Sequence, residues 1–327
     1  MKKNTCCYAL LCIATILIGC SNPTKSVKAE APTTVVGKHG KLSVNKTFLV
    51  DEKGEKIQLR GVSYGWHNWW PRFYNASTVK TFAEDWSCTL LRAAIGVEEN
   101  GCYIDNPEEA IRCATIIADA AIAQGIYVII DWHSHSIRTE EAKLFFTQMA
   151  NRYKDQPNVI YEIFNEPVED SWEDVKAYSI EIIRTIRAID ADNIILVGTP
   201  HWDQDIHLAA DNPITGFDNL MYTLHFYAAS HQQELRDRGD YALQKGLPIF
   251  VSECAGMEAT GNGPINLTEW AEWVSWMKRN AISWAAWSIA DKDETCSMMK
   301  KTASSTGPWT EDDLKEWAII CRSDLLK

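Results

Sequence analysis

Eight short apolar runs, evenly spaced along most of the chain, constrain the fold more than any other feature of this sequence. Their starts are roughly 30 residues apart, which is the length of one strand followed by one helix. Most of the runs are continuously apolar, as expected for parallel strands that are buried on both faces. The eight runs are Ile57–Val62, Thr89–Ile95, Ile126–Asp131, Val159–Phe164, Ile194–Gly198, Leu220–His225, Pro248–Glu253 and Ile282–Trp287.

This spacing predicts an α/β fold in which eight strand–helix units close into a (β/α)8 TIM barrel. An open, doubly wound sheet is the alternative, but the sequence lacks the GxGxxG fingerprint typical of dinucleotide-binding members of that class. Before the first run, Leu42–Val50 and Glu55 flank a turn at Asp51–Gly54. We expect a short β-hairpin here, covering the N-terminal end of the barrel.

Helix signals lie between the runs. Asn106 and Pro107 form an N-cap followed by a first-turn proline, and Gly125 ends the same helix. Ser171 begins a sequence typical of a capping box, and Thr310 is expected to open the last helix. Each signal falls where a barrel needs a helix to begin or end.

The N-terminal segment has the pattern of an export signal. Two lysines precede an apolar run at residues 8–18 that is too short to span a bilayer and ends next to Cys20. This resembles a bacterial lipoprotein signal; an ordinary secretory peptide is the alternative. We therefore expect a signal over residues 1–19, lipidation of Cys20, a flexible tether over residues 20–36 and one folded domain over residues 37–327. The protein would be exported and lipid-anchored in the outer membrane, at the cell surface or in the periplasm.

Composition narrows the range of partners. The net charge of −12 argues against binding to the phosphate backbone of nucleic acid, and there is no phosphate-binding glycine loop. The six cysteines outside the signal have no CxxC spacing, so we expect no zinc site, and free thiols and disulfides remain open. We expect no cofactor and no metal, membrane contact only through the lipid, and a monomer.

Polar residues gather where the predicted strands end, which is where a TIM barrel places its active site. Two of them are glutamates, Glu166 after the fourth run and Glu253 at the end of the seventh, on opposite sides of the ring. Cleavage of a glycosidic bond needs such a pair, with one carboxyl protonated and the other ionised. The other polar or aromatic residues at these ends are Arg92, His133, Asn165, His225, Tyr227 and Trp287.

The chemistry of these neighbours fits the same reaction. Arg92 can hold one glutamate ionised, and Tyr227 can donate a hydrogen bond to the nucleophile. Asn165 can bind a sugar hydroxyl, and Trp287 can stack beneath the reacting ring. A separation of the carboxyls of about 5–5.5 Å gives retention of configuration, and about 6.5–9.5 Å gives inversion.

Taken in order, these strand-end motifs resemble glycoside hydrolase family 5 of clan A, within its bacterial endo-β-1,4-glucanase (cellulase) subfamily. The similarity covers nearly all of residues 40–314, so residues 37–327 would form the catalytic domain. The resemblance implies a retaining mechanism with Glu166 as acid/base and Glu253 as nucleophile. Arg92, His133, Asn165, His225 and Tyr227 would support this pair.

The resemblance also implies substrate-binding residues. Lys292 and Glu294 would contact sugars on the non-reducing side, and Trp69 and Trp202 would stack against sugars on the two sides of the cleavage point. The sequence departs from the family at Cys254-Ala255, where Trp-Gly is usual, and at Gly65, where a histidine is usual. His67 is expected to take the place of that histidine.

Several functions stay open on the sequence alone. Endo-hydrolysis of cellulose and related β-glucans is the leading hypothesis, with mixed-linkage glucan, xyloglucan and β-mannan as competing substrates. A transglycosylase would use the same residues. A surface glycan-binding lipoprotein without activity is the alternative from another class.

Overall fold

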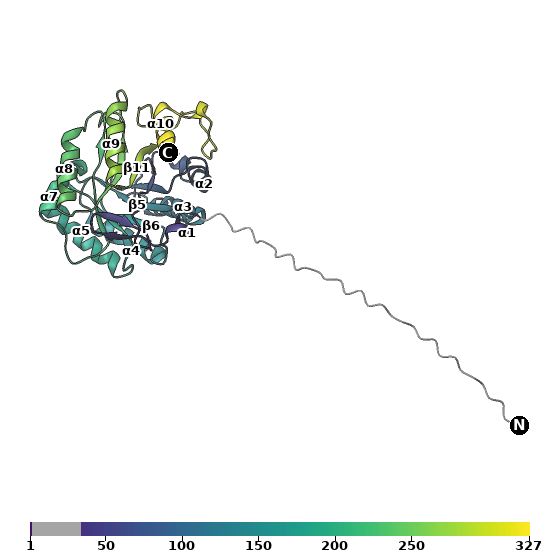
Figure 1. Cartoon of the computed structure of the whole chain (residues 1–327), viewed down its shortest axis with the longest axis horizontal. Helices are drawn as coiled ribbons and strands as arrows, with labels where there is room; N and C mark the ends of the chain where they lie inside the picture. The colour runs from purple at the N-terminus through teal and green to yellow at the C-terminus, as the bar shows by residue number, and fades with distance from the viewer. Residues whose placement is uncertain (2–33) are drawn as a thin grey trace. The chain divides into compact units, whose positions relative to one another are not determined.

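Eight parallel strands close into a barrel in the part of the chain that the computed structural model describes, Met1 and residues 34–327 (Figure 1). Strand β11 pairs with both β3 and β10, which completes the ring. Each predicted run overlaps one strand, so the barrel prediction is confirmed. The strands are β3 (Arg60–Tyr64), β4 (Leu90–Gly96), β5 (Tyr127–His133), β6 (Val159–Glu162), β7 (Ile195–Val197), β8 (Leu220–Thr223), β10 (Ile249–Ala255) and β11 (Trp284–Ile289).

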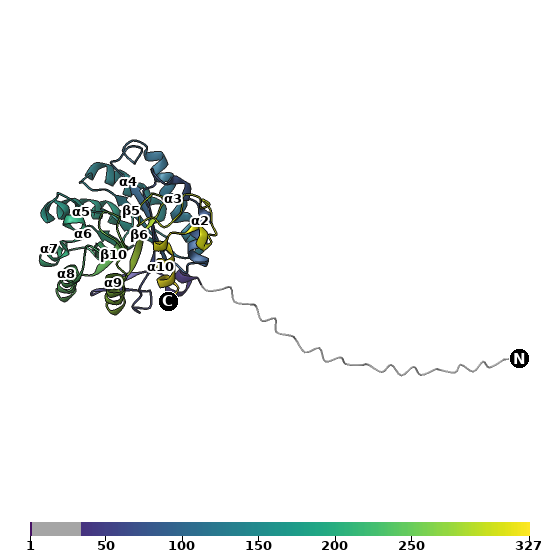
Figure 2. The same ribbon diagram turned by 90° about the horizontal axis from the view of Figure 1, so that it is seen from above.

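Helices surround the strands, as the view in Figure 2 shows. A large buried cluster of side chains fills the layer between strands and helices, and it includes the tryptophans Trp270, Trp273 and Trp276. The longer helices are α2 (Ala76–Glu84), α3 (Pro107–Gln124), α4 (Thr139–Tyr153), α5 (Trp172–Arg187), α7 (Ile206–Asp211), α8 (Gln233–Gln244), α9 (Leu267–Arg279) and α10 (Glu316–Leu325).

The helix caps follow the sequence signals in two places. The Asn106 side chain accepts a hydrogen bond from the backbone N–H of Glu109, and α3 ends at Gly125 in the left-handed region, with φ of 66°. Ser171 caps α5 by accepting from the backbone N–H of Asp174. The prediction that Thr310 opens the last helix was wrong in detail. Thr310 caps a short 3-10 turn, Glu311–Asp313. Because Leu314 is extended, the last helix begins only at Glu316.

The N-terminal end of the barrel is closed by a hairpin of β1 (Ser43–Asn45) and β2 (Phe48–Val50). Its turn lies at residues 46–47, so the predicted turn at Asp51–Gly54 is a second bend that follows the strand pair. Leu42 and Leu49 pack into the barrel interior together with Tyr127 and Phe250. The hairpin therefore covers the N-terminal end, as expected.

A short helix, α1 (Val35–His39), joins this closed end. The backbone N–H of Val36 donates to the carbonyl of Gly125, which precedes β5, and Val35 and Val36 pack against the barrel interior cluster. The described chain therefore begins beside the N-terminal ends of the strands.

Several predictions concern residues that the structure does not describe. Apart from Met1, the signal at residues 1–19 lies outside the described residues, as do Cys20 and the tether up to residue 33. Within the described residues, no helix has the length and apolar character needed to cross a bilayer. The cysteines at 88, 102, 113, 254, 296 and 321 are buried free thiols.

Candidate active site

The two glutamates predicted to face each other do so at the C-terminal end of the barrel. Glu166 follows β6 and Glu253 lies within β10, and one carboxylate oxygen of each approaches to within 4.8 Å. Both side chains are nearly inaccessible, with exposures of 12% and 5%. The site therefore presents two carboxyls to a single small volume.

Arg92 organises the Glu253 side of this pair. From β4, its Nη1 donates to Glu253 Oε2 at 3.0 Å and its Nη2 donates to Asn165 Oδ1 at 2.6 Å. Two further carboxylates contact the guanidinium: Asp131 Oδ2 lies 3.0 Å from Nη2, and Glu162 Oε2 lies 2.7 Å from Nε. The whole cluster is buried, so the charge of Arg92 is shared among three carboxylates.

Tyr227 completes the contacts of Glu253. It lies in β9 (Phe226–Tyr227), which pairs with the end of β10, and its hydroxyl donates to Glu253 Oε1 at 2.7 Å. Both oxygens of Glu253 are thus engaged, one by Tyr227 and the other by Arg92.

His225 organises the other carboxyl. Its Nδ1 lies 2.9 Å from Glu166 Oε1, while its Nε2 lies 2.8 Å from Ser252 Oγ and 3.2 Å from Asp203 Oδ2. Burial disfavours a charged imidazole, but the carboxylates of Asp203, Glu162 and Glu166 raise the pKa of His225 well above its usual value. His225 is therefore charged and donates to Glu166.

These surroundings act differently on the two glutamates. Burial raises the pKa of Glu166, but hydrogen bonds from His135 and His225 outweigh it and lower the pKa to about 2. Burial, and then the negative charge of Glu166, raise the pKa of Glu253 against the opposing effects of Arg92, His225 and Tyr227. In the ligand-free protein, Glu166 is ionised and Glu253 binds a proton more readily.

Two groups next to the pair are oriented for a ligand. Arg92 holds the oxygen of Asn165, whose buried Nδ2 has no hydrogen-bond partner among the described residues. The rings of His133 and Trp287 are parallel, with centroids 5.2 Å apart, and Asp131 holds His133 Nδ1 at 2.7 Å. The rings of His133 and Trp287 line a hollow that Glu166 and Glu253 also line, and the free amide of Asn165 is adjacent to Glu166 in the chain.

The cleft extends to both sides of Glu166 as two hollows. One, of about 320 Å³, is lined by Trp69, Trp287, Lys292 and Glu294, and the other, of about 440 Å³, is lined by Trp202 and His225. Both hollows share Glu166, Tyr227, Ala259 and Thr260. The carboxyl pair therefore lies between two binding surfaces, each with an exposed tryptophan.

Trp202 is presented by an unusual backbone. It belongs to α6 (Pro200–Asp203), in which His201, Trp202 and Asp203 all have positive φ, between 55° and 58°. A left-handed turn of non-glycine residues costs roughly 1–2 kcal/mol per residue. The backbone N–H of Trp202 donates to the carbonyl of Pro167. The turn thus ties the exposed tryptophan to the residue after Glu166.

Of the remaining predicted substrate contacts, two line a hollow and one does not. Lys292 and Glu294 pair at 3.0 Å and line the hollow next to Trp69, as the resemblance implied. His67 does not line either hollow: it is fully buried, and its Nδ1 accepts from the backbone N–H of Gly96. The expectation that His67 faces a ligand was therefore wrong, because the first loop turns its ring inward.

Sequence reasoning missed five polar residues of the site. Asp131 and Glu162 point into the barrel toward Arg92, and a charged residue at the end of an apolar run or inside one is the signal that could have found them. His135 lies 3.5 Å from Glu166 and follows His133 by two residues. The other two are Ser252 and Asp203.

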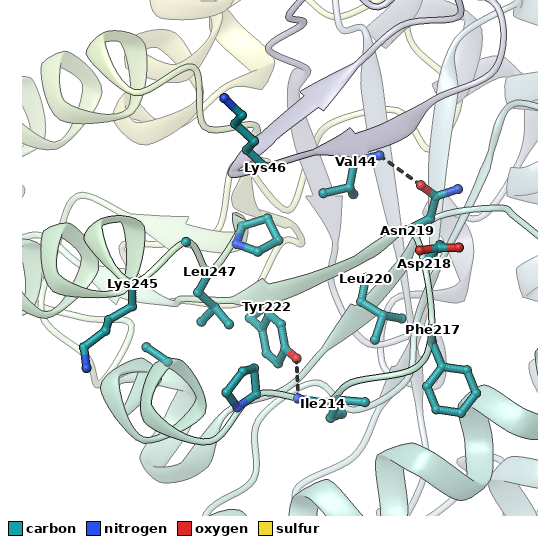
Figure 3. A pocket seen from close by; sticks show the side chains of 14 residues that line it. Val44, Lys46, Ile214, Phe217, Asp218, Asn219, Leu220, Tyr222, Lys245 and Leu247 are labelled. Carbon is teal, nitrogen blue, oxygen red and sulfur yellow. Dashed lines mark hydrogen bonds between the residues drawn. The ribbon is translucent and has the colours of Figure 1, made fainter.

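A third hollow, of about 540 Å³, lies at the opposite end of the barrel (Figure 3). Val44 of the hairpin and Leu220 and Leu247 near strand starts line it, and the hydroxyl oxygen of Tyr222 accepts a hydrogen bond from the backbone N–H of Ile214. None of the cleft residues belongs to it.

The charged side chains of the cleft already have protein partners. Within the described residues, one group of three histidine, cysteine or acidic side chains has ligand atoms close enough together for a single ion. It consists of Glu166, His225 and Glu253. Both nitrogens of His225 and both oxygens of Glu253 are hydrogen-bonded to the protein. We therefore assign no metal ligands here.

Comparisons with known proteins agree with this geometry. Residues 50–293 match the sequence profile of the cellulase family, glycosyl hydrolase family 5. An endoglucanase from Clostridium saccharobutylicum is 44% identical over 309 residues, covering 92% of this chain and 68% of that protein. Endoglucanase 5 from Pectobacterium carotovorum subsp. carotovorum is 41% identical over 333 residues, covering 99% of this chain and 65% of that protein. The chain thus spans about two thirds of the length of these relatives.

Solved structures are similar over the whole barrel. A structure from Cytophaga hutchinsonii has a TM-score of 0.88 and 44% identity, and the match covers 89% of this chain and 96% of that one. A variant of the Thermobifida fusca endoglucanase Cel5A catalytic domain, in complex with cellotetraose, has a TM-score of 0.85 and 32% identity. The match covers 90% of this chain and 100% of that one. With the sequence profile, the relatives and the barrel in agreement, the chain belongs to the cellulase family of glycoside hydrolases, family 5.

Proposed function

We propose that this protein is a retaining endo-β-1,4-glucanase that cleaves internal linkages of cellulose and related β-glucans. The observation that carries the proposal is the carboxyl pair, whose oxygens approach to within 4.8 Å between two ligand-sized hollows. This spacing fits retaining enzymes, whose carboxyls are about 5–5.5 Å apart, better than inverting enzymes, in which they are about 6.5–9.5 Å apart.

In the first step Glu253 attacks the anomeric carbon, and the glycosidic C–O bond breaks as Glu166 gives its proton to the leaving oxygen. This forms a glycosyl ester on Glu253. In the second step Glu166, now ionised, takes a proton from water, and the resulting hydroxide equivalent displaces the ester. Glu253 leaves as a carboxylate, and Glu166 is protonated again.

The surrounding contacts support these roles. The first step needs a protonated Glu166. Before substrate binds, however, the pKa of Glu166 is lowered and that of Glu253 is raised, so a single proton on the pair favours Glu253. Arg92 and Tyr227 engage both oxygens of Glu253 and so stabilise its carboxylate form, and a docked glycosidic oxygen offers an acceptor for a proton on Glu166. The free Nδ2 of Asn165 is suited to the sugar 2-hydroxyl beside the ester.

The two hollows support internal cleavage. Trp69 and Trp202 are 50% and 40% exposed and lie on different sides of Glu166, so sugar rings can stack both before and after the broken bond. The relatives named endoglucanase and the solved complex with cellotetraose favour a β-1,4-glucan over mixed-linkage glucan, xyloglucan or β-mannan.

Two variants test the proposal. Glu166→Gln and Glu253→Gln should each lower the release of reducing sugar from carboxymethylcellulose by roughly 100-fold or more. Glu99→Gln, which changes an exposed glutamate after β4, is the matched control and should keep parental activity. Proton NMR of early products should show the β-anomer first. Near-parental rates in both variants, or the α-anomer first, would contradict the proposal.

A polysaccharide panel with product sizing separates the remaining alternatives. A mixture of short oligosaccharides from cellulose supports endo-hydrolysis, and faster release from another glucan or from mannan would change the substrate. Products longer than the supplied cellotetraose would indicate a transglycosylase. Tight retention of glucan without any released sugar would indicate a glycan-binding lipoprotein instead.

We also propose export as a lipoprotein, anchored through Cys20. The support is sequence alone: the apolar run at residues 8–18 followed by Cys20, all outside the described residues. Cys20→Ala should move the protein from the membrane fraction to the soluble fraction and abolish incorporation of labelled palmitate. Unchanged fractionation and labelling in the variant would contradict an anchor at this residue.

A further inference from the structure

His135 occupies a position next to the acid/base that the family resemblance did not assign. It lies in the loop between β5 and α4, and its Nε2 is 3.5 Å from Glu166 Oε2. The other oxygen, Oε1, is already held by His225 at 2.9 Å. Glu166 is thus contacted by a different histidine at each oxygen, and His135 is at the oxygen that His225 leaves free.

The loop that carries His135 is fixed by neighbouring residues. The hydroxyls of Ser134 and Ser136 both donate to Glu98 Oε1, and the backbone N–H of Glu166 donates to the carbonyl of Ser134 at 3.2 Å. The imidazole of His135 lies over the ring of Trp66, with centroids 5.7 Å apart and planes 26° apart. Acid/base and histidine are therefore held together by backbone and side chain.

We propose that His135 is a positioning residue for the acid/base: it holds the cleft-facing oxygen of Glu166 and governs which carboxyl of the pair carries the shared proton. The proposal rests on the function proposed above. The His135 side chain is 40% exposed and lines the hollow next to Trp69, so it is open to solvent, whereas the side chain of His225 is only 1% exposed. His135 is thus the partner of Glu166 that can respond to pH and to an entering sugar.

The charges around His135 support this role. Glu166, Glu98 and Glu253 face it from the loops and strand ends after β6, β4 and within β10, and together they raise its pKa despite burial. The ring of His133 lies 6.0 Å from that of His135, His225 contacts Glu166 at its other oxygen, and Arg138 lies 3.8 Å from Glu98. A charged His135 keeps Glu166 ionised, so removing that charge should let Glu166 hold its proton to higher pH.

The test compares His135→Gln and His135→Phe, the second of which keeps a ring over Trp66, by the pH profile of kcat with cellotetraose and of kcat/KM with an activated substrate. With cellotetraose bound, both variants should move the basic limb of kcat upward by about one pH unit, since in the enzyme–substrate complex that limb reports loss of the proton on the acid. With 2,4-dinitrophenyl β-cellobioside, whose leaving group departs without protonation, variant and parent profiles should coincide in shape. His207→Gln on α7, outside the cleft, is the matched control and should shift neither profile.

The outcomes separate the inference from the function on which it rests. A fall in rate that is equal at every pH and for both substrates would show that His135 only supports the loop, which overturns the proposal. An unmoved or lowered basic limb overturns it too. If Glu166→Gln retained activity on carboxymethylcellulose, the proposed function itself would fail, whereas a normal loss there with no limb shift defeats the role of His135 alone.

Discussion

At its closed end the barrel is filled by apolar side chains such as Leu90 and Ile160, whereas toward its open end the same group of strands, β4 to β6, buries Arg92, Asp131 and Glu162. The closed end gains free energy from burial of apolar surface, roughly 25 cal/mol per Å². The open end carries desolvated charges, which favour folding only while every partner is present. The comparison shows that the same strands supply apolar core residues near one end of the barrel and the buried charged residues of the cleft near the other.

The largest effect should come from removing the central cation at the open end. Arg92→Met leaves Asp131, Glu162 and Glu253 without their shared partner. We expect a loss of about 3–5 kcal/mol in the free energy of unfolding and a fall in kcat of roughly 100-fold or more. Urea unfolding and cellotetraose kinetics measure both. A variant that stays stable would show that the open end does not depend on charge balance.

The closed end should respond differently. Phe250→Ala opens a cavity in the fully buried interior cluster, and we expect a loss of about 3–5 kcal/mol in stability. Activity of the folded protein should be unchanged at low temperature, because none of the cleft residues belongs to this cluster. If kcat falls along with stability, the two ends are mechanically coupled and the comparison breaks down.

Opposite pKa shifts at the open end predict opposite stability effects. The pKa of Glu166 is lowered to about 2, so its stabilisation is full above the unfolded value of 4.5 and is lost as pH falls through that interval. Glu166→Gln should remove up to about 3 kcal/mol near pH 7 and flatten the acid limb of stability. The pKa of Glu253 is raised, so its ionisation disfavours folding and Glu253→Gln should stabilise the protein near pH 7. Urea unfolding from pH 7 to pH 3 checks both signs, and equal signs would contradict the assignment.

The smallest effect should come from the cleft surface. Trp202→Ala removes a 40% exposed ring that contributes to neither core cluster. We expect KM for cellotetraose to rise by about tenfold, corresponding to about 1.4 kcal/mol of stacking, while stability stays within roughly 0.5 kcal/mol of the parent. A large loss of stability would instead show that the left-handed turn at residues 201–203 supports the fold.

Much of the barrel could be predicted because its strands are continuous apolar runs, and their even spacing matches the length of one strand–helix unit. The turn of the hairpin and the start of α10 were misplaced because several polar stretches there can turn, and packing decides between them. Asp51–Gly54 is a turn, but Lys46 adopts a positive φ of 57° and closes the strand pair first.

The site was predictable only as far as residues stand at strand ends. Glu166 and Glu253 do, and the structure brings them together with Arg92, which reaches Glu253 from within β4. His67 could not be placed because a loop histidine gives no sign of which way its ring turns. Asp203 reaches His225 through a left-handed turn of three non-glycine residues, which backbone preferences argue against.

The position of α1 has a consequence for where this barrel could be attached to anything else. The continuously described part of the chain starts at Thr34 beside the hairpin, at the barrel end opposite the carboxyl pair. The point at which Thr34 joins the preceding chain therefore lies away from the cleft residues. An attachment made at that point would not cover the cleft.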